Sequence, residues 1–222
     1  MTQRQTKDLL YEQVARIGKA VSSPKRLELL ELLAQGEKTV EQLAEELSID
    51  VKLASAHLKG LREARLVTFR KAGSYAVYRL TGDDVAGLCV KLREVAEDHL
   101  LELSVALGQM AASPQQLLPI DRSTLLERAQ RGEVVVIDVR PPDEFAQAHL
   151  PFARSMPLAE LTSRLAELPR DKEIVAYCRG PFCLLSDEAC ALLASQGYRV
   201  KKLRDGVTDW QAAGLPMAEA AS

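Results

Sequence analysis

The 222-residue chain has few aromatic residues, few histidines and few cysteines. Aromatic residues make up 5% of the chain, with a single tryptophan, and there are three histidines and four cysteines. Three of the cysteines fall between positions 178 and 190, so they are too few and too clustered to predict a disulfide-bonded scaffold. The small number and the clustering of cysteines indicate a protein of the reducing cytoplasm.

The sequence also lacks any run of about 18 apolar residues, so it predicts no transmembrane helix. Residues 1–8 are mostly polar and lack the apolar core of a signal peptide. Hydrophobic residues make up 47% of the chain and charged residues 27%, which is typical of a globular protein with a buried core. We therefore expect a cytoplasmic protein of one large or two small domains that does not associate with membranes.

The formal net charge of −2 hides an uneven distribution of charge along the chain. Residues 51–80 contain seven Lys or Arg and a single acid, whereas residues 81–112 contain two Lys or Arg and six acids. A basic stretch on a nearly neutral chain indicates a localised anionic partner rather than general attraction to anions.

Helical patterns and capping residues organise the N-terminal half. Apolar residues recur at helical spacing over 6–20, and Ser23 with Pro24 predicts the start of a helix over about 24–35. Thr39 with Gln42 has the form of a capping box for a helix over 39–47. Asp50 is placed to cap the next helix, over about 51–64, so this pair predicts a helix-turn-helix.

Two strand patterns and a long helical pattern follow. Residues 66–70 and 74–80 read as strands around a turn at 71–73, which predicts a β-hairpin wing. Residues 83–112 then read as one long helix. Its length exceeds what a small domain can cover, so a partner helix is expected.

Four segments resemble the ArsR family of winged-helix repressors. They are Ser-Pro-Lys-Arg-Leu-Glu-Leu-Leu at 23–30, the helix at 39–47, Ala-His-Leu-Lys-Gly-Leu-Arg-Glu-Ala-Arg-Leu-Val at 56–67, and Tyr-Arg-Leu at 78–80. The resemblance spans about residues 6–110. It implies a homodimer that binds double-stranded operator DNA, with the first helix and the 83–112 helix as the dimer surface.

The resemblance also implies that the 51–64 helix enters the major groove while the wing contacts phosphates or the minor groove. Polar, small and basic residues on the helix and the wing are the candidates for contacting DNA. They are Lys52, Ser55, Ala56, His57, Lys59, Arg62, Arg70, Lys71 and Ser74. For each cation taken singly, a solvated surface position is an equally good interpretation.

Many ArsR-type repressors sense metals, but this chain departs from their patterns. Thr39 to Gln42 stand where a cysteine pair would bind thiophilic metals, and Cys89 has no second cysteine near it in sequence. Asp98, His99 and Glu102 supply part of a dimer-bridging metal site without its full ligand set. We therefore expect no metal and no other cofactor, and expect the sensor to lie outside the winged-helix region.

Residues 112–119 have a proline near each end and predict a semi-stiff linker. We therefore divide the chain into a winged-helix domain over 1–112, a linker over 113–119 and a second domain over 120–222. The second domain alternates helices, over about 121–131, 143–149, 158–168, 184–196 and 206–213, with strands over 134–138, 173–177 and 199–203. This alternation predicts an α/β fold with a mainly parallel sheet.

Three motifs in the second domain resemble the rhodanese family. They are the 136–158 segment around Asp138, Arg140 and Glu144, the loop Tyr-Cys-Arg-Gly at 177–180, and the ending around Gly206 and Trp210. In rhodaneses, the cysteine in the place of Cys178 takes sulfane sulfur from a donor such as thiosulfate and holds it as a persulfide. The six-residue loop from Cys178 to Cys183 matches the length found in sulfurtransferases.

Cys178 also reads as a reactive thiolate from its surroundings alone. It ends an apolar strand pattern, passes through a Gly-Pro turn and opens into a helix, so backbone N–H groups and the helix dipole converge on it. Arg179, Gly180, Pro181, Phe182 and Leu184 are the candidates for the cradle of a persulfide anion. Asp138 and Arg140 lie at the same sheet edge; we interpret Asp138 as structural, and Arg140 as equally suited to structure or anion steering.

Cys183 stands at a loop end where a hydroxyl or another polar residue is common in rhodaneses, and it is a candidate resolving thiol. Our leading hypothesis is a DNA-binding repressor that senses reactive sulfur, as persulfide, polysulfide or thiosulfate, through Cys178. One alternative is an active thiosulfate-type sulfurtransferase with an attached DNA-binding domain. Another is an arsenic-responsive regulator that uses Cys178 and Cys183.

Overall fold

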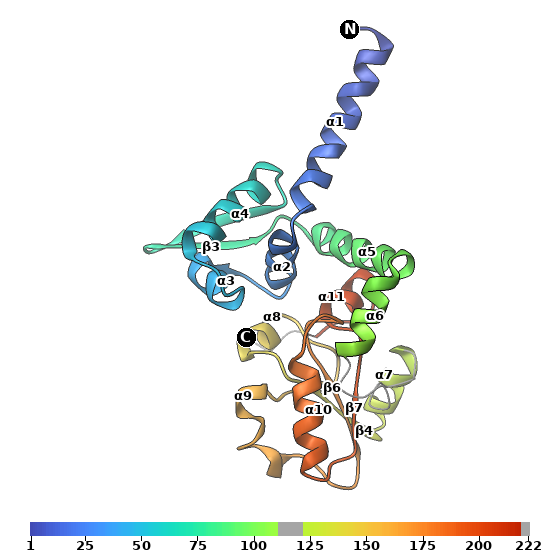
Figure 1. The fold of residues 1–222 in the computed structure, drawn as a ribbon. Helices are drawn as coiled ribbons and strands as arrows, with labels where there is room; N and C mark the ends of the chain where they lie inside the picture. The colour runs from blue at the N-terminus through green and yellow to red at the C-terminus, as the bar shows by residue number, and fades with distance from the viewer. Residues whose placement is uncertain (111–121, 219–222) are drawn as a thin grey trace. The chain divides into compact units, whose positions relative to one another are not determined.

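The computed structural model describes residues 1–110 and 122–218, and the predicted linker at 113–119 lies outside them. The chain divides into two compact units, Met1–Cys89 and Val90–Ser222 (Figure 1). Across the described ranges, no helix combines the length and the apolar character needed to cross a membrane.

Four helices build the first unit: α1 (Gln3–Val21), α2 (Pro24–Leu33), α3 (Val40–Glu46) and α4 (Val51–Glu63). Two capping signals were predicted correctly: Thr39 and Gln42 form a capping box at α3, and the Asp50 side chain accepts a hydrogen bond from the Leu53 N–H at α4. At α2 the helix begins at Pro24 as predicted, but the Ser23 side chain makes no capping hydrogen bond. Leucines of α2, α3 and α4 are fully buried in one core. This core fixes α4 against α2 and α3, as a helix-turn-helix requires.

The predicted wing is the hairpin of β2 (Val67–Ala72) and β3 (Tyr75–Leu80), with Gly73 at φ +61° in its turn. A two-residue strand that was not predicted, β1 (Lys38–Thr39), pairs with the other edge of β3, so the strand order is β1-β3-β2. All pairings in this sheet are antiparallel. The short strand ties the start of α3 to the base of the wing.

The prediction of one helix over 83–112 is wrong, because the helix is interrupted at Leu100. The structure has α5 (Asp83–His99) and α6 (Leu101–Met110). At the junction the Leu103 N–H donates to the Leu100 carbonyl, and the Ser104 hydroxyl donates to the Glu97 carbonyl. These local bonds satisfy backbone groups that a continuous helix would have paired differently.

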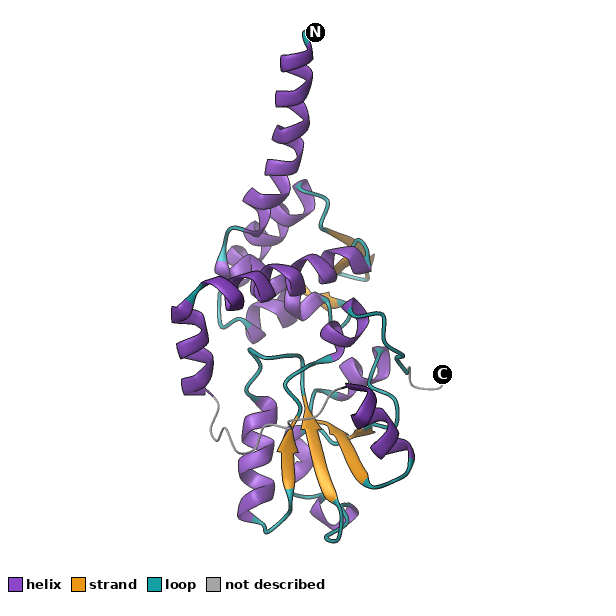
Figure 2. Cartoon of the chain, turned by 90° about the vertical axis from the view of Figure 1, so that its right-hand side faces the viewer, coloured by secondary structure: helices purple, strands orange, loops and turns teal. Residues whose placement is uncertain are grey.

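The second unit contains a four-stranded sheet of order β5-β4-β6-β7 in which every pairing is parallel. Its strands are β4 (Val134–Asp138), β5 (Arg154–Ser155), β6 (Glu173–Tyr177) and β7 (Val200–Lys202), and their arrows run the same way in Figure 2. Strand β5 was not predicted. All five residues of β4 are buried, as expected of a parallel strand covered on both faces.

Helices cover both faces of this sheet. Cluster contacts place α9 (Leu158–Leu161) and α10 (Leu185–Ser195) on one face, and α7 (Arg122–Gln130) and α11 (Val207–Ala212) on the other. Figure 1 shows α10 and α7 on opposite sides of the strands. The remaining helical pieces are α8 (Pro142–Gln147) and a 3-10 turn at Leu165–Glu167, so the helix predicted over 158–168 is split in two.

Candidate functional site

The cysteine loop follows β6 and leads into α10. Cys178 comes directly after the last residue of β6, and its side chain packs with residues of β4, β6 and α10 in one core cluster. The turn that reverses the chain is closed by the Cys183 N–H, which donates to the Gly180 carbonyl at 3.1 Å. The Cys183 N–H is therefore taken up by the loop's own turn.

The Cys178 sulfur lies 3.1 Å from the Ser186 hydroxyl, and 3.4 Å and 3.8 Å from the carbonyl oxygens of Cys183 and Gly180. The two carbonyl oxygens accept from a protonated thiol, whereas the Ser186 hydroxyl can rotate to donate to a thiolate. Ser186 was not singled out in the sequence. The sequence feature that could have identified Ser186 is a hydroxyl side chain in the first turn of the helix that follows the loop.

Several groups act on the pKa of the Cys178 thiol. Burial raises it, but hydrogen bonds from the side chains of Cys183 and Ser186 and from the backbone of Ser186 and Gly180 outweigh burial and lower the pKa to about 6. The pKa of Cys183 is raised, because its thiol serves as the donor to Cys178 and because it is buried. These contacts favour the thiolate form at Cys178 and the thiol form at Cys183.

Arg179, a candidate for the persulfide cradle, is paired with a carboxylate. Its guanidinium donates to both carboxylate oxygens of Glu144, at 2.5 Å and 3.0 Å, and Glu144 is almost completely buried. Glu144 lies in α8, 35 residues earlier in the chain, so no local pattern predicted this partner. The pair anchors the loop to α8.

The two residues at the end of β4 form a fully buried ion pair. The Arg140 side chain donates to both carboxylate oxygens of Asp138, at 2.6–3.1 Å, and to the Ala148 carbonyl at 2.8 Å. Burial lowers the pKa of Arg140, but the hydrogen bond and the charge of Asp138 outweigh it, and the net pKa is raised. Both side chains have zero exposure, which favours the structural interpretation of both residues over anion steering.

The other two cysteines are less suited to chemistry. Cys190 is fully buried in the sheet core, and burial raises the pKa of its thiol to about 12. Cys89 is partly buried against the core of the first unit. Both cysteines therefore pack against the cores of their units.

We predict that alkylation of Cys178 by iodoacetamide rises with pH through a midpoint near 6 and levels off by about pH 8. An ordinary thiol continues to gain reactivity up to its pKa of about 8.5. The Ser186→Ala variant removes a hydrogen bond to the thiolate, so its midpoint moves to higher pH. Mass spectrometry of the alkylated peptides measures both profiles, and identical profiles would contradict the role given to Ser186.

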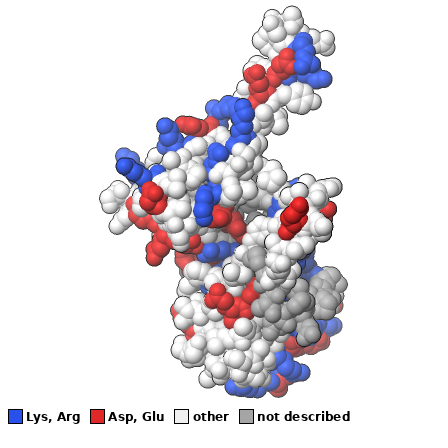
Figure 3. Space-filling view, in the orientation of Figure 1, with Lys and Arg blue, Asp and Glu red and all other residues white. Residues whose placement is uncertain are grey.

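The candidate DNA-contacting residues lie on α4 and the wing. Lys52, Ser55, Ala56, Lys59 and Arg62 are exposed on α4, and His57 is half-buried. Arg70, Lys71 and Ser74 are exposed on the wing. In Figure 3 basic side chains appear over this part of the molecule with acidic ones between them, so the surface is not uniformly basic.

The two arginines among these candidates, Arg62 and Arg70, contact other side chains of the protein. Arg62 lies over the ring of Phe69, 5.4 Å from its centroid, and Phe69 stacks on Tyr78. Arg70 donates twice to one carboxylate oxygen of Glu37, at 2.7 Å and 3.0 Å. Neither partner was predicted, and the Glu37 pair reduces the positive charge that the wing presents.

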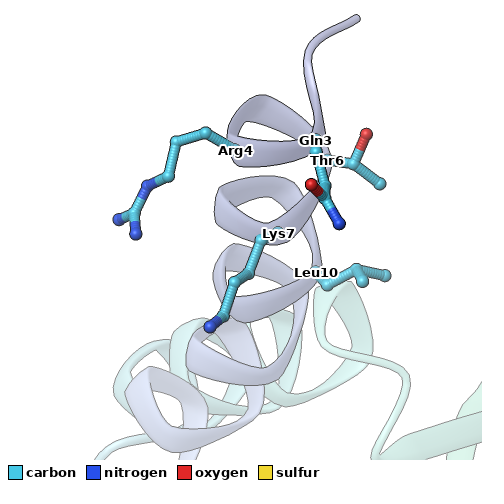
Figure 4. Close-up of a pocket in the computed structure, with 5 residues that line it drawn as sticks. All are labelled: Gln3, Arg4, Thr6, Lys7 and Leu10. Carbon is cyan, nitrogen blue, oxygen red and sulfur yellow. The ribbon is translucent and has the colours of Figure 1, made fainter.

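A surface hollow on α1 is lined by Gln3, Arg4, Thr6, Lys7 and Leu10. Figure 4 shows that these side chains project from successive turns of a single helix and do not converge on one point. Among the described residues, no second element contributes to the lining. The hollow is therefore not a candidate site.

Comparisons with known proteins match the N-terminal and the C-terminal parts of the chain to two different families. The model described as "Bacterial regulatory protein, arsR family" matches residues 23–68, and the model of the rhodanese-like domain matches residues 121–213. The HTH-type transcriptional regulator Rv0324 of Mycobacterium tuberculosis is 43% identical over 219 residues, covering 99% of this chain and 96% of that protein.

Two further relatives each match one half of the chain. A sulfurtransferase of Allochromatium vinosum is 40% identical over 100 residues, covering 44% of this chain and 92% of that protein. The solution structure of the homodimeric winged helix-turn-helix DNA-binding domain of Mb0332 from Mycobacterium bovis is 41% identical. It covers 46% of this chain and 93% of that chain, with a TM-score of 0.42.

Proposed function

Because this chain belongs to the ArsR family of bacterial transcriptional regulators and carries a C-terminal rhodanese-like domain, we propose that it is a homodimeric repressor that senses reactive sulfur at Cys178. The observation that carries the proposal is the pair of thiols in the cysteine loop, of which Cys178 has its pKa lowered to about 6. Such a thiolate attacks sulfane sulfur at neutral pH.

Loading with sulfur changes the loop in two steps. The Cys178 thiolate first takes a sulfur atom and becomes a persulfide. The Cys183 thiol then loses its proton to solvent and attacks the Cys178 sulfur, which forms a disulfide between the two cysteines and releases hydrosulfide. Closure replaces an anionic loop with a neutral, covalently bridged one, and this difference is the signal.

The test is fluorescence anisotropy of a labelled fragment of the gene's own upstream DNA at fixed salt, because phosphate contacts make the affinity salt-dependent. Wild type and Cys178→Ser are compared in the reduced and the polysulfide-treated states. We expect treatment to change the affinity of wild type by about 5- to 150-fold, the usual range of allosteric coupling, and to leave the variant unchanged.

Cys190→Ser is the matched control, because it removes a buried thiol outside the loop and should respond as wild type does. A response retained in Cys178→Ser would contradict the proposal. So would tight DNA binding by wild type that ignores polysulfide.

A working sulfurtransferase is the second candidate, favoured by the six-residue loop and by the sulfurtransferase relative of A. vinosum. It predicts repeated transfer of sulfur from a donor to an added acceptor such as cyanide. In that case Cys183→Ser keeps or raises the turnover, since ring closure would interrupt the cycle. DNA affinity independent of the loop would favour this candidate.

We also predict that Glu37→Gln strengthens binding to a DNA duplex of any sequence by about three- to tenfold at low salt, because Arg70 is then free to contact a phosphate. The same substitution in an Arg70→Gln background should give little gain. Anisotropy titrations of wild type, the two single variants and the double variant measure this difference. Equal gains in both backgrounds would show that Glu37 acts by general repulsion or through Arg79, whose guanidinium lies 4.0 Å from the same carboxylate.

A further inference from the structure

The rim of the cysteine loop is apolar. Phe182 is 41% exposed and Leu184 is 47% exposed, and both are loop residues that precede α10. Cys178 itself is 2% exposed, so a donor must reach it through this loop. A small, weakly hydrated donor fits this rim, whereas a strongly hydrated one loses water there without replacement.

The cation nearest in sequence to Cys178 is neutralised. Arg179 makes two hydrogen bonds to the Glu144 carboxylate, and both side chains are largely buried. A buried carboxylate at 2.5 Å compensates most of the charge that Arg179 would otherwise offer to an anion at the loop.

Three further cations around the loop are compensated in the same way. Each has a carboxylate partner within the second unit: Arg140 with Asp138, Lys202 with Asp187, and Arg93 with Asp209. The Arg93 guanidinium lies 5.9 Å from the centre of the Phe182 ring, and it also pairs with Glu97 at 3.5 Å. These four basic side chains therefore each have a carboxylate counter-charge.

We infer that the sulfur donor of this site is a thiol persulfide or polysulfide, whose reacting end is a chain of sulfur atoms, and not the oxyanion thiosulfate. The inference rests on the proposed role of Cys178 as sulfur acceptor. Thiosulfate is a strongly hydrated dianion whose sulfonate head gains most from an uncompensated cation, and the apolar rim and the paired cations do not supply one. A sulfur chain is soft and packs against phenylalanine and leucine.

The transfer balances without an added oxidant. The Cys178 thiolate attacks the outer sulfur of a persulfide R–S–SH, a new S–S bond forms, and the donor S–S bond breaks. The electron pair leaves with R–S⁻, and the proton stays on the transferred sulfur, so Cys178 becomes Cys178–S–SH. The donor sulfur is the oxidant for the later closure by Cys183.

The experiment measures the initial rate at which the full chain gains one sulfur atom, by intact mass. Cysteine persulfide and thiosulfate are compared at equal concentration in a Cys183→Ser background that retains the persulfide. We expect roughly tenfold or faster loading by cysteine persulfide, since thiosulfate must approach without an uncompensated cation. Thiosulfate loading as fast as the persulfide would overturn the inference.

A gain-of-function variant gives a second test. Phe182→Arg places an unpaired cation on the rim, and we expect it to raise the thiosulfate rate by about tenfold while changing the persulfide rate much less. Phe152→Arg is the matched control, because Phe152 is an exposed phenylalanine of the same unit outside the loop. Equal changes of both rates in Phe182→Arg would overturn the inference.

The inference and the proposed function fail in different ways. If cysteine persulfide loads Cys178 and DNA affinity does not change, the sensor function is contradicted and the donor class stands. If thiosulfate loads as fast as the persulfide and DNA affinity changes, the donor class is contradicted and the sensor function stands.

Discussion

Replacing Asp138 with alanine is expected to lower the free energy of unfolding of the second unit by about 3–5 kcal/mol, because it leaves the fully buried Arg140 guanidinium without its carboxylate. Urea unfolding followed by the fluorescence of Trp210 measures the change. Trp210 is the single tryptophan of the chain and is fully buried in the second unit, so its signal reports on that unit alone.

Two further variants test the cause of this loss. Asp143→Ala removes an exposed carboxylate from the first turn of α8 and should cost less than about 1 kcal/mol. Replacing both members of the pair, as Asp138→Leu with Arg140→Met, should recover much of the stability, since no unpaired charge stays buried. If the double variant is as unstable as Asp138→Ala, the loss comes from packing and not from the stranded charge.

Replacing Gly206 with alanine is expected to displace the cysteine loop. A methyl group there would overlap the Arg179 carbonyl and would lie 2.6 Å from the Gly180 backbone nitrogen. These contacts are to backbone atoms, so the loop or the start of α11 must move, at a cost of about 1–3 kcal/mol. Moving the loop separates Cys178 from the groups that stabilise its thiolate.

We therefore expect Gly206→Ala to slow the alkylation of Cys178 at pH 7 several-fold and to lower the midpoint of urea unfolding. Gly108→Ala is the control, because a methyl group at that helical glycine meets nothing within 4 Å. It should leave the alkylation rate unchanged and the stability equal or slightly higher. An alkylation rate unchanged in Gly206→Ala would show that the loop tolerates the methyl group.

The elements that were predicted correctly are those with a local signal. The capping box of Thr39 and Gln42 was predictable because it depends on residues three apart. Strands β4 and β6 were predictable because parallel strands buried on both faces are continuously apolar. The same apolar run placed Cys178 at the end of β6, and the resemblance to rhodaneses then implied its role as sulfur acceptor.

The features that were missed depend on contacts between distant residues or on short segments. Strands β1 and β5 have two residues each, which is too short for any periodic pattern. The pair of Arg179 with Glu144 and the pair of Arg70 with Glu37 join residues more than 30 positions apart. Both pairs neutralise cations that the sequence alone presented as available, so the missed contacts bear directly on charge at the two sites.

The contact of Arg62 with Phe69 has a mechanical consequence. It joins α4 to β2, and the stacking of Phe69 on Tyr78 continues the connection to β3. We therefore expect α4 and the wing to keep a fixed orientation relative to each other. If sulfur loading regulates the proposed dimer, we expect it to change the separation or the tilt of the two α4–wing pairs while the angle within each pair stays constant. Regulation would then alter which spacing of half-sites is bound, while the bases read within each half-site stay the same.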